Sequence, residues 1–122
     1  MNSTQSKNSN VASIIARRND IRLVTSDSPW GKAESVTEIA DGIYSYSTPA
    51  HGGYRLNRQR NATVSAILKK ATCQQLGLRG WYEEDVDWAI VVYTFPECFG
   101  KQRYNQALKS LKTYHKEAWD QL

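Results

Sequence analysis

Long hydrophobic runs are missing from this chain of 122 residues, and its longest apolar window spans only residues 88–93. A helix that crosses a bilayer needs roughly 20 apolar residues, so we expect no membrane segment. Proline and glycine are also few, at 3 and 7 residues, which excludes a collagen-like or low-complexity chain. Hydrophobic residues make up 40% and charged residues 23%, the balance of an ordinary globular domain.

Cysteine is scarce as well. Cys73 and Cys98 are too few for the disulfide scaffold of a small secreted domain, and no Cys-x-x-Cys or Cys/His pair has zinc-ligand spacing. We therefore expect two free, buried thiols in a reducing cytoplasm, and neither a metal nor a cofactor. Residues 1–10 are rich in Ser and Asn without an apolar segment, so we expect a disordered tail, not a signal peptide, before a single domain at 11–122.

Charge is unevenly distributed along the chain. Residues 1–80 carry 11 Lys/Arg and 5 Asp/Glu, residues 81–99 carry five acids and no base, and residues 100–122 carry 5 bases and 2 acids. The net charge of +4 is a weak signal for nucleic acid by itself. A basic face for phosphate or an acidic partner and an ordinary solvated surface both fit this pattern. The basic clusters that would form such a face are Arg17-Arg18, Arg55/Arg58/Arg60 and Lys69-Lys70.

The clearest local signal is a β-hairpin. Asp41-Gly42 separates two segments of strand-like composition, and this dipeptide suits a two-residue type I′ turn. The pattern predicts strands at 33–40 and 43–48. Pairing directly across the turn would place four side chains on one face: Thr37, Ile39, Tyr44 and Tyr46.

Upstream of the hairpin we expect a short helix at 11–18, a short strand at 20–25 and a turn at 27–31. Downstream, Tyr54-Arg55-Leu56 resumes as a strand, and Asn57 is a plausible N-cap for an amphipathic helix over 58–76.

Gly77 would end that helix. Residues 83–95 fit either a helix or a strand, and the acids at their start favour a helix. Residues 101–121 read as a last helix with the semi-buried His115 on its inner stripe. The fold class is α+β, with a small antiparallel sheet or hairpin packed by two or three helices.

His51-Gly52-Gly53 is the first chemically suggestive motif. Two glycines allow close backbone approach and an anion nest, His titrates near neutrality, and Arg55 could hold a phosphate or carboxylate. The alternative is a sharp turn after the hairpin, with His51 bonded to a carbonyl.

The second motif is an acidic run, Glu83 to Asp87, flanked by Trp81 and Trp88. Such acids can ligate a hard metal, act in acid–base catalysis, or pair with arginines. The alternative is a helix start, with acids placed for its dipole and the tryptophans in the core. If an active site exists, its catalytic candidates are His51, Glu83, Glu84 and Asp85.

Three stretches together resemble an uncharacterised family of proteins from phages, plasmids and other mobile elements: Ser28-Pro29-Trp30-Gly31, Asp41 through Leu56, and Gly80 through Ala89 with Phe95-Pro96-Glu97. The similarity covers about residues 28–99, outside which lie the first 27 residues and the last helix. Family members commonly have Cys where this chain has Val86. The resemblance implies an origin in mobile elements and the cytoplasm of a bacterial host, and it implies no chemistry.

Small proteins of such elements often inhibit a host defence system, which requires a surface and no active site. Our first hypothesis is therefore a protein-binding inhibitor of the anti-CRISPR or anti-restriction type, whose partner is a host defence protein or complex. The alternatives are a small enzyme acting on a nucleotide or phosphate ester through a His/acid site, and a nucleic-acid-binding regulator. The residues expected to bind a partner are Trp30, Tyr46, His51, Gly52, Gly53, Arg55, Arg58, Arg60, Trp81 and Tyr82.

Overall fold

The computed structural model describes residues 25–122. The tail expected at 1–10 and the helix expected at 11–18 lie outside the described residues, as does most of the strand expected at 20–25. The turn expected at 27–31 is confirmed as the connection between two short paired strands, β1 (Asp27–Ser28) and β2 (Gly31–Lys32).

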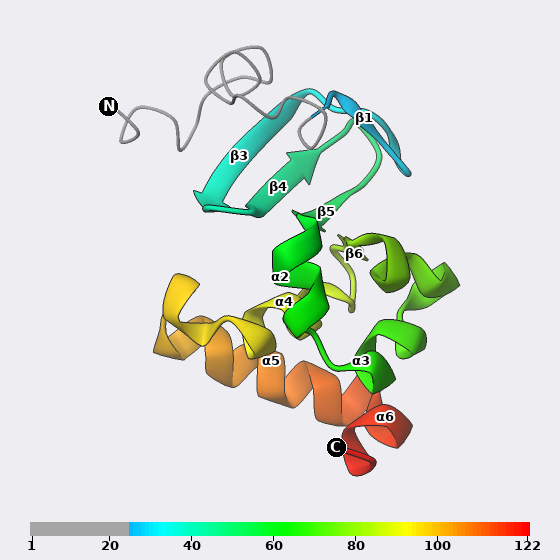
Figure 1. The fold of residues 1–122 in the computed structure, drawn as a ribbon, viewed down its shortest axis with the longest axis vertical. Helices are drawn as coiled ribbons and strands as arrows, with labels where there is room; N and C mark the ends of the chain where they lie inside the picture. Colours follow the sequence, from blue (N-terminus) through cyan, green and yellow to red (C-terminus); the bar gives the residue numbers. More distant parts are fainter. Residues whose placement is uncertain (1–24) are drawn as a thin grey trace.

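The fold is α+β, as the sequence indicates. Its main sheet is antiparallel and four-stranded, in the order β3-β4-β5-β6. The strands are β3 (Ser35–Ala40), β4 (Ile43–Ser47), β5 (Gly52–Leu56) and β6 (Trp81–Glu83). Figure 1 shows β3 and β4 on one side of the molecule and most helices on the other.

The Asp41-Gly42 hairpin is confirmed, but the register expected across it is wrong beyond the first pair. Ala40 pairs with Ile43 as expected, and then the register shifts, so that Glu38 lies opposite Tyr44. The shift is a bulge at residue 39, which adds one residue to β3. A one-residue slip exchanges the two faces of a strand. The bulge therefore separates Ile39, which packs against the helices, from Tyr44 on the opposite face.

The single helix expected over 58–76 is wrong. The chain forms α2 (Arg58–Thr63), α3 (Ala66–Ala71) and the 3₁₀ segment η2 (Cys73–Arg79). Asn57 caps α2 as predicted, by accepting a 2.9 Å hydrogen bond from Arg60 N. Val64 is extended at φ −69°, ψ 139°, and Ser65 then caps α3 with its hydroxyl.

The expected helix stop also lies elsewhere. Gly80, at φ 91°, ends η2, whereas Gly77 lies inside that segment. A positive φ at the end of a helical segment favours glycine, and Gly80 N bonds to the carbonyl of Gly77. Two non-glycine residues within η2, Gln74 and Gln75, have φ of 60° and 58°.

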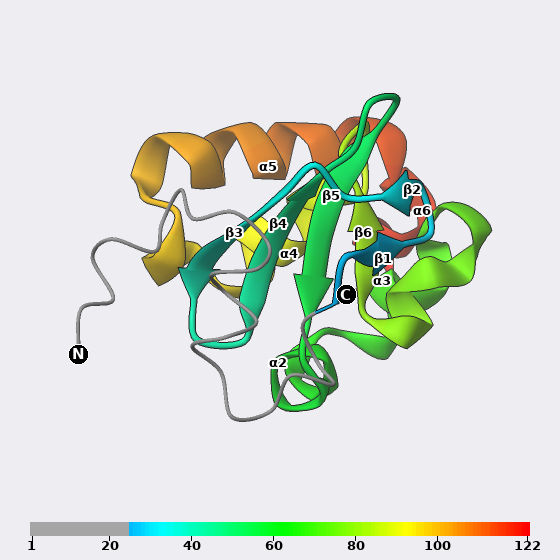
Figure 2. The ribbon, with the colours of Figure 1, turned by 90° about the horizontal axis from the view of Figure 1, so that it is seen from above.

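The remaining helices pack on one face of the sheet. They are α4 (Trp88–Thr94), η3 (Pro96–Cys98), α5 (Lys101–Tyr114) and α6 (Lys116–Asp120). The helix favoured over 83–95 is thus confirmed for its second half, and its first half contributes to β6 and a turn. The helix expected over 101–121 is interrupted at His115, where φ is −126°. Figure 2 shows α5 running behind the strands.

Two apolar clusters fill the two sides of the sheet. The larger one joins Ile43, Leu56 and Tyr82 to α4, α5 and the buried side chains Val64 and Leu68. The smaller one lies on the opposite face and consists of Val36, Tyr44, Tyr46, Leu76 and Trp81, with Trp30 and Ala33 packed against it. The β1–β2 turn and Leu76 of η2 therefore cover the face opposite the larger cluster.

The expectation of free cysteines is confirmed, and the expectation that both are buried is wrong. Cys73 is exposed and Cys98 is half-buried. Among the described residues, no helix is long and apolar enough to cross a membrane.

Candidate functional site

The His51-Gly52-Gly53 segment has a structural explanation. Thr48 and His51 close the loop between β4 and β5, because Thr48 N and Oγ1 both donate to the His51 carbonyl, at 2.8 and 2.6 Å. A Cβ on Gly53 would lie 2.3 Å from the Tyr82 carbonyl oxygen and 2.5 Å from the Trp30 ring. Gly53 is therefore required by close packing within the sheet, and the His51 side chain is exposed beside it.

Glu83 caps the turn that follows β6. Its Oε1 accepts hydrogen bonds of 2.7 Å from both Val86 N and Asp87 N, and its Oε2 accepts one of 2.9 Å from Asp85 N. Amides at a helix start have no partner within the helix, so a carboxylate placed here satisfies them. Glu83 thus has a structural role in the acidic run. Within the described residues, no hydrogen bond joins His51 to Glu83, Glu84 or Asp85, the residues proposed from the sequence as its catalytic partners.

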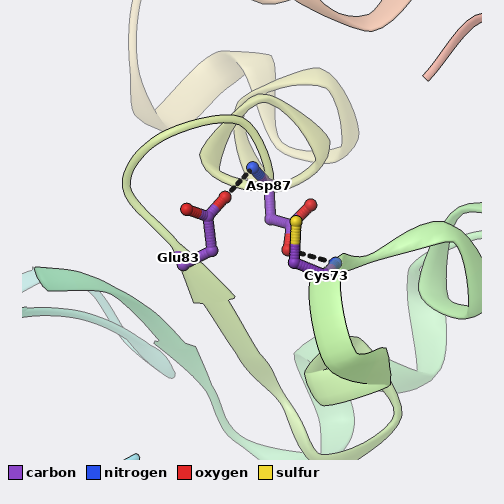
Figure 3. Close-up of side chains that lie close together, drawn as sticks. All are labelled: Cys73, Glu83 and Asp87. Atoms are coloured by element: carbon purple, nitrogen blue, oxygen red, sulfur yellow. Dashed lines mark hydrogen bonds between the residues drawn. The ribbon is translucent and has the colours of Figure 1, made fainter. Parts of the chain in front are cut away.

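Asp87 is the centre of a buried network. Its side chain is fully buried, its Oδ2 accepts a 2.8 Å bond from Cys73 N, and its Oδ1 shares a 2.9 Å bond with His115 Nε2. Figure 3 shows Asp87 close to Cys73, at the start of η2, and to Glu83, at the end of β6. The network therefore ties η2, α4 and the junction of α5 and α6 together.

Cys73, Glu83 and Asp87 also form the arrangement most similar to a metal site. Their potential ligand atoms lie within 4.8 Å of one another. Each oxygen of the two carboxylates already takes part in a hydrogen bond within the fold. Desolvation, and then the charges of Asp87 and Glu83, raise the pKa of the Cys73 thiol. A protonated thiol is a poor nucleophile, and both carboxylates are engaged within the fold, so we assign this group a structural role.

A different feature faces solvent where β5 meets α2. It is a hollow of about 400 Å³, which we call the basic hollow. Three arginines and one lysine line it together with apolar and amide side chains. Its lining residues are Arg55, Leu56, Arg58, Asn61, Ala62, Lys69, Leu78 and Arg79.

Asn61 fixes the floor of the basic hollow. Its amide nitrogen donates a 2.9 Å bond to the Gly77 carbonyl, and its side-chain oxygen accepts from the Tyr82 hydroxyl. The Asn61 carbonyl accepts a 3.2 Å bond from Lys69 Nζ. Three elements, α2, η2 and β6, are thereby held in place, and one of the four cations is oriented.

No carboxylate lines the basic hollow, and no carboxylate of residues 25–122 forms an ion pair with its cations. Arg58 and Arg79 are exposed. The Arg55 guanidinium stacks over the Trp81 ring at 4.6 Å, and its buried Nε has no hydrogen-bond partner among the described residues. These four side chains therefore concentrate positive charge that the described part of the fold does not neutralise.

The structure separates the residues that the sequence proposed as a binding surface. Tyr46, Trp81 and Tyr82 are buried in the two cores, so the expectation that they lie on the surface is wrong. Gly52 and Gly53 are buried within the sheet. Trp30 and Arg60 are half-buried, His51 is exposed on the loop, and only Arg55 and Arg58 line the basic hollow.

A family model described as Domain of unknown function (DUF7007) matches residues 24–122. The chain belongs to the DUF7007 family. This agrees with the resemblance to an uncharacterised family, and the match includes the last helix, which lies outside the expected range of about 28–99. No curated protein and no solved structure matches the chain. The DUF7007 domain thus includes every residue of the basic hollow and of the Asp87 network.

Sequence analysis missed parts of both features. Asn61, Leu78 and Arg79 line the basic hollow, and the Asp87–His115 pair joins positions 28 residues apart. The basic clusters Arg55/Arg58/Arg60 and Lys69-Lys70 were a partial signal, because Arg55, Arg58 and Lys69 line the hollow whereas Arg60 and Lys70 do not. Nothing in the local sequence indicates that Asn61 would orient Lys69, or that His115 would meet Asp87.

Proposed function

We propose that this DUF7007 protein acts by stoichiometric binding to a macromolecular partner, and not by turnover of a substrate. The observation that carries this proposal is the contrast between its acids and its bases. Glu83 and Asp87 are engaged inside the fold, whereas the cations of the basic hollow lack ion-pair partners among residues 25–122 and two of them are exposed.

The sequence resemblance gives this binding activity a biological setting. We propose an accessory protein of a phage or other mobile element that works in the bacterial cytoplasm and inhibits a defence complex of the CRISPR–Cas or restriction type. Such machines act on nucleic acid, so an inhibitor with a basic surface can compete for the same ligand or dock on an acidic protein patch. Strong negative charge, the usual property of a DNA mimic, is absent from this chain of net charge +4.

Phage plating tests the proposal. The protein is expressed in bacteria that carry one defined defence system, and plaques of a targeted phage are counted with and without it. We expect plating to rise by orders of magnitude for at least one system, and the purified protein to inhibit that complex at near-equimolar amounts. No rise with any member of a panel of CRISPR–Cas and restriction systems would contradict the proposal.

Two sets of variants separate binding from catalysis. His51→Ala and Glu84→Ala should keep the inhibitory activity, because neither residue lines the basic hollow. Arg58→Ala combined with Arg79→Ala should lose it. The small-enzyme alternative predicts the opposite pattern, together with inhibition by far less than one molecule per target.

A further inference from the structure

We propose that the basic hollow binds the phosphate backbone of a single-stranded nucleic acid, with one nucleotide unit entering the hollow. This inference deepens the proposed function and depends on it for its biological meaning, although the binding itself is measured independently. The carrying observation is a concave site with four cations, no lining carboxylate and an apolar wall.

The size of the hollow favours a strand over a duplex. Its volume of about 400 Å³ lies at the lower end of the range for small-molecule sites. A duplex presents its phosphates on a convex surface, whereas a flexible single strand can turn one nucleotide into a concavity. Leu78 is 50% exposed at this wall and offers a base an apolar contact.

The cations are arranged for phosphate. Arginine binds phosphate oxygens through paired N–H donors, and three of the four cations are arginines. Lys69 is oriented by the Asn61 carbonyl. The Arg55 guanidinium lies over the Trp81 ring, 4.6 Å from its centre, and its buried Nε–H lacks an acceptor among residues 25–122. Two of the four cations, Arg55 and Lys69, are therefore positioned before the ligand arrives.

The hollow has no exposed aromatic ring among its lining residues, so base stacking contributes little to its affinity. Binding should depend mainly on charge and should discriminate weakly between sequences. An acidic peptide would also be attracted by four cations, and a carboxylate has two anionic oxygens just as a phosphodiester does, but such a peptide would leave the apolar wall at Leu78 without a base. A nucleotide unit, with its phosphate on the cations and its base on the apolar wall, is thus the ligand that uses both parts of the hollow.

The test is fluorescence anisotropy with a labelled 20-nucleotide oligothymidylate and the full chain. If all four cations contact phosphates, the logarithm of the binding constant should fall against the logarithm of salt with a slope of about −2.8, at roughly 0.7 per contact for a single strand. Arg58→Ala/Arg79→Ala should reduce the slope to about −1.4 and weaken binding about 25-fold at 0.1 M salt, since two contacts are lost. Both side chains are exposed, so the variant should fold normally.

The matched control is Lys101→Ala/Lys109→Ala, which removes the same charge from exposed positions on α5. It should leave both slope and affinity nearly unchanged. Equal weakening by the two double variants would show diffuse charge attraction and overturn the assigned site. Tighter binding of a 20-base-pair duplex would overturn the single-strand assignment.

Competition identifies the chemistry. Unlabelled oligothymidylate should displace the probe, whereas polyglutamate of equal charge and inorganic pyrophosphate should displace it poorly. Effective displacement by polyglutamate would assign the hollow to acidic protein surfaces instead, and effective displacement by pyrophosphate would assign it to free phosphate ligands. Because these assays need no defence system, a negative plating result with positive strand binding would reject only the inhibitor function.

Discussion

Removal of the Asp87 carboxylate should cost the fold more than any exposed acid does. Asp87→Ala leaves the buried His115 ring nitrogen and the part-buried Cys73 amide without their partner. An unpaired buried polar group costs about 1–3 kcal/mol, and a partly solvated one about 0.5–1.5 kcal/mol. The free energy of unfolding should therefore fall by about 2–4 kcal/mol, a large part of the 5–15 kcal/mol typical of small domains.

Urea unfolding followed by tryptophan fluorescence measures this loss. Asp85→Ala is the matched control, because Asp85 is exposed in the same turn and should change stability by less than about 0.5 kcal/mol. Asp87→Asn retains an oxygen for the Cys73 amide and should lie between the two. The unfolding free energies of the two alanine variants are comparable only if both have the same slope of free energy against urea concentration. A changed slope would indicate a changed unfolded state.

The reasoning fails if Asp87→Ala costs no more than Asp85→Ala at an unchanged urea slope. That result would mean that water replaces the hydrogen bonds of Asp87 without loss of stability. The network would then not hold η2, α4 and the α5–α6 junction together. His115→Ala provides an independent check. It should also destabilise, and the double variant with Asp87→Ala should cost less than the sum of the singles, because both remove the same bond.

Three further changes test other parts of the structure. Desolvation and the charges of Asp87 and Glu83 raise the pKa of the Cys73 thiol, so its alkylation near pH 8 should be slower than that of a model thiol and keep rising at higher pH. Asp87→Asn should speed the reaction at pH 8, and an unchanged rate would contradict the electrostatic cause. Gly53→Ala should destabilise by about 1–3 kcal/mol in thermal unfolding, since its Cβ would lie 2.3 Å from the Tyr82 carbonyl oxygen and 2.5 Å from the Trp30 ring; a neutral result would show that both the β6 backbone and the ring shift at little cost. Glu83→Gln should lower the free energy of unfolding in urea by about 1 kcal/mol, because the Gln side chain has one acceptor oxygen, whereas the two Glu83 oxygens accept hydrogen bonds from three amides. An unchanged free energy of unfolding would show that water satisfies these amides equally well.

Local signals in the sequence predicted local structure. Asp41-Gly42 located the hairpin because a two-residue turn depends on the residues within it, and Asn57 identified the start of α2 for the same reason. The register failed because the bulge at residue 39 places Ile39 on the helix-packed face, which is a tertiary effect. Propensity could not reveal that the chain would extend at Val64 and begin a new helix after Ser65.

The candidate site was accessible to sequence analysis only in part. Charge clustering located Arg55, Arg58 and Lys69, because like charges close in sequence often share a face. It could not show that η2 would turn through Gln74 and Gln75 and bring Arg79 to the same hollow. The aromatic residues Tyr46, Trp81 and Tyr82 were wrongly predicted to lie on the surface, because composition does not distinguish a ring in the core from a ring on the surface.

The segment that builds most of the basic hollow begins and ends at adjacent strands. Leu56 N donates a 2.8 Å bond to the Gly80 carbonyl, so the two ends of residues 57–79 meet at one hydrogen bond. A segment with such closely spaced ends can be replaced without moving the sheet, provided that its apolar anchors Val64, Leu68 and Leu76 and its polar ties at Asn61 and Cys73 are retained. Replacement of this segment should therefore change ligand preference on a constant sheet, much as antibodies vary loops on a constant scaffold.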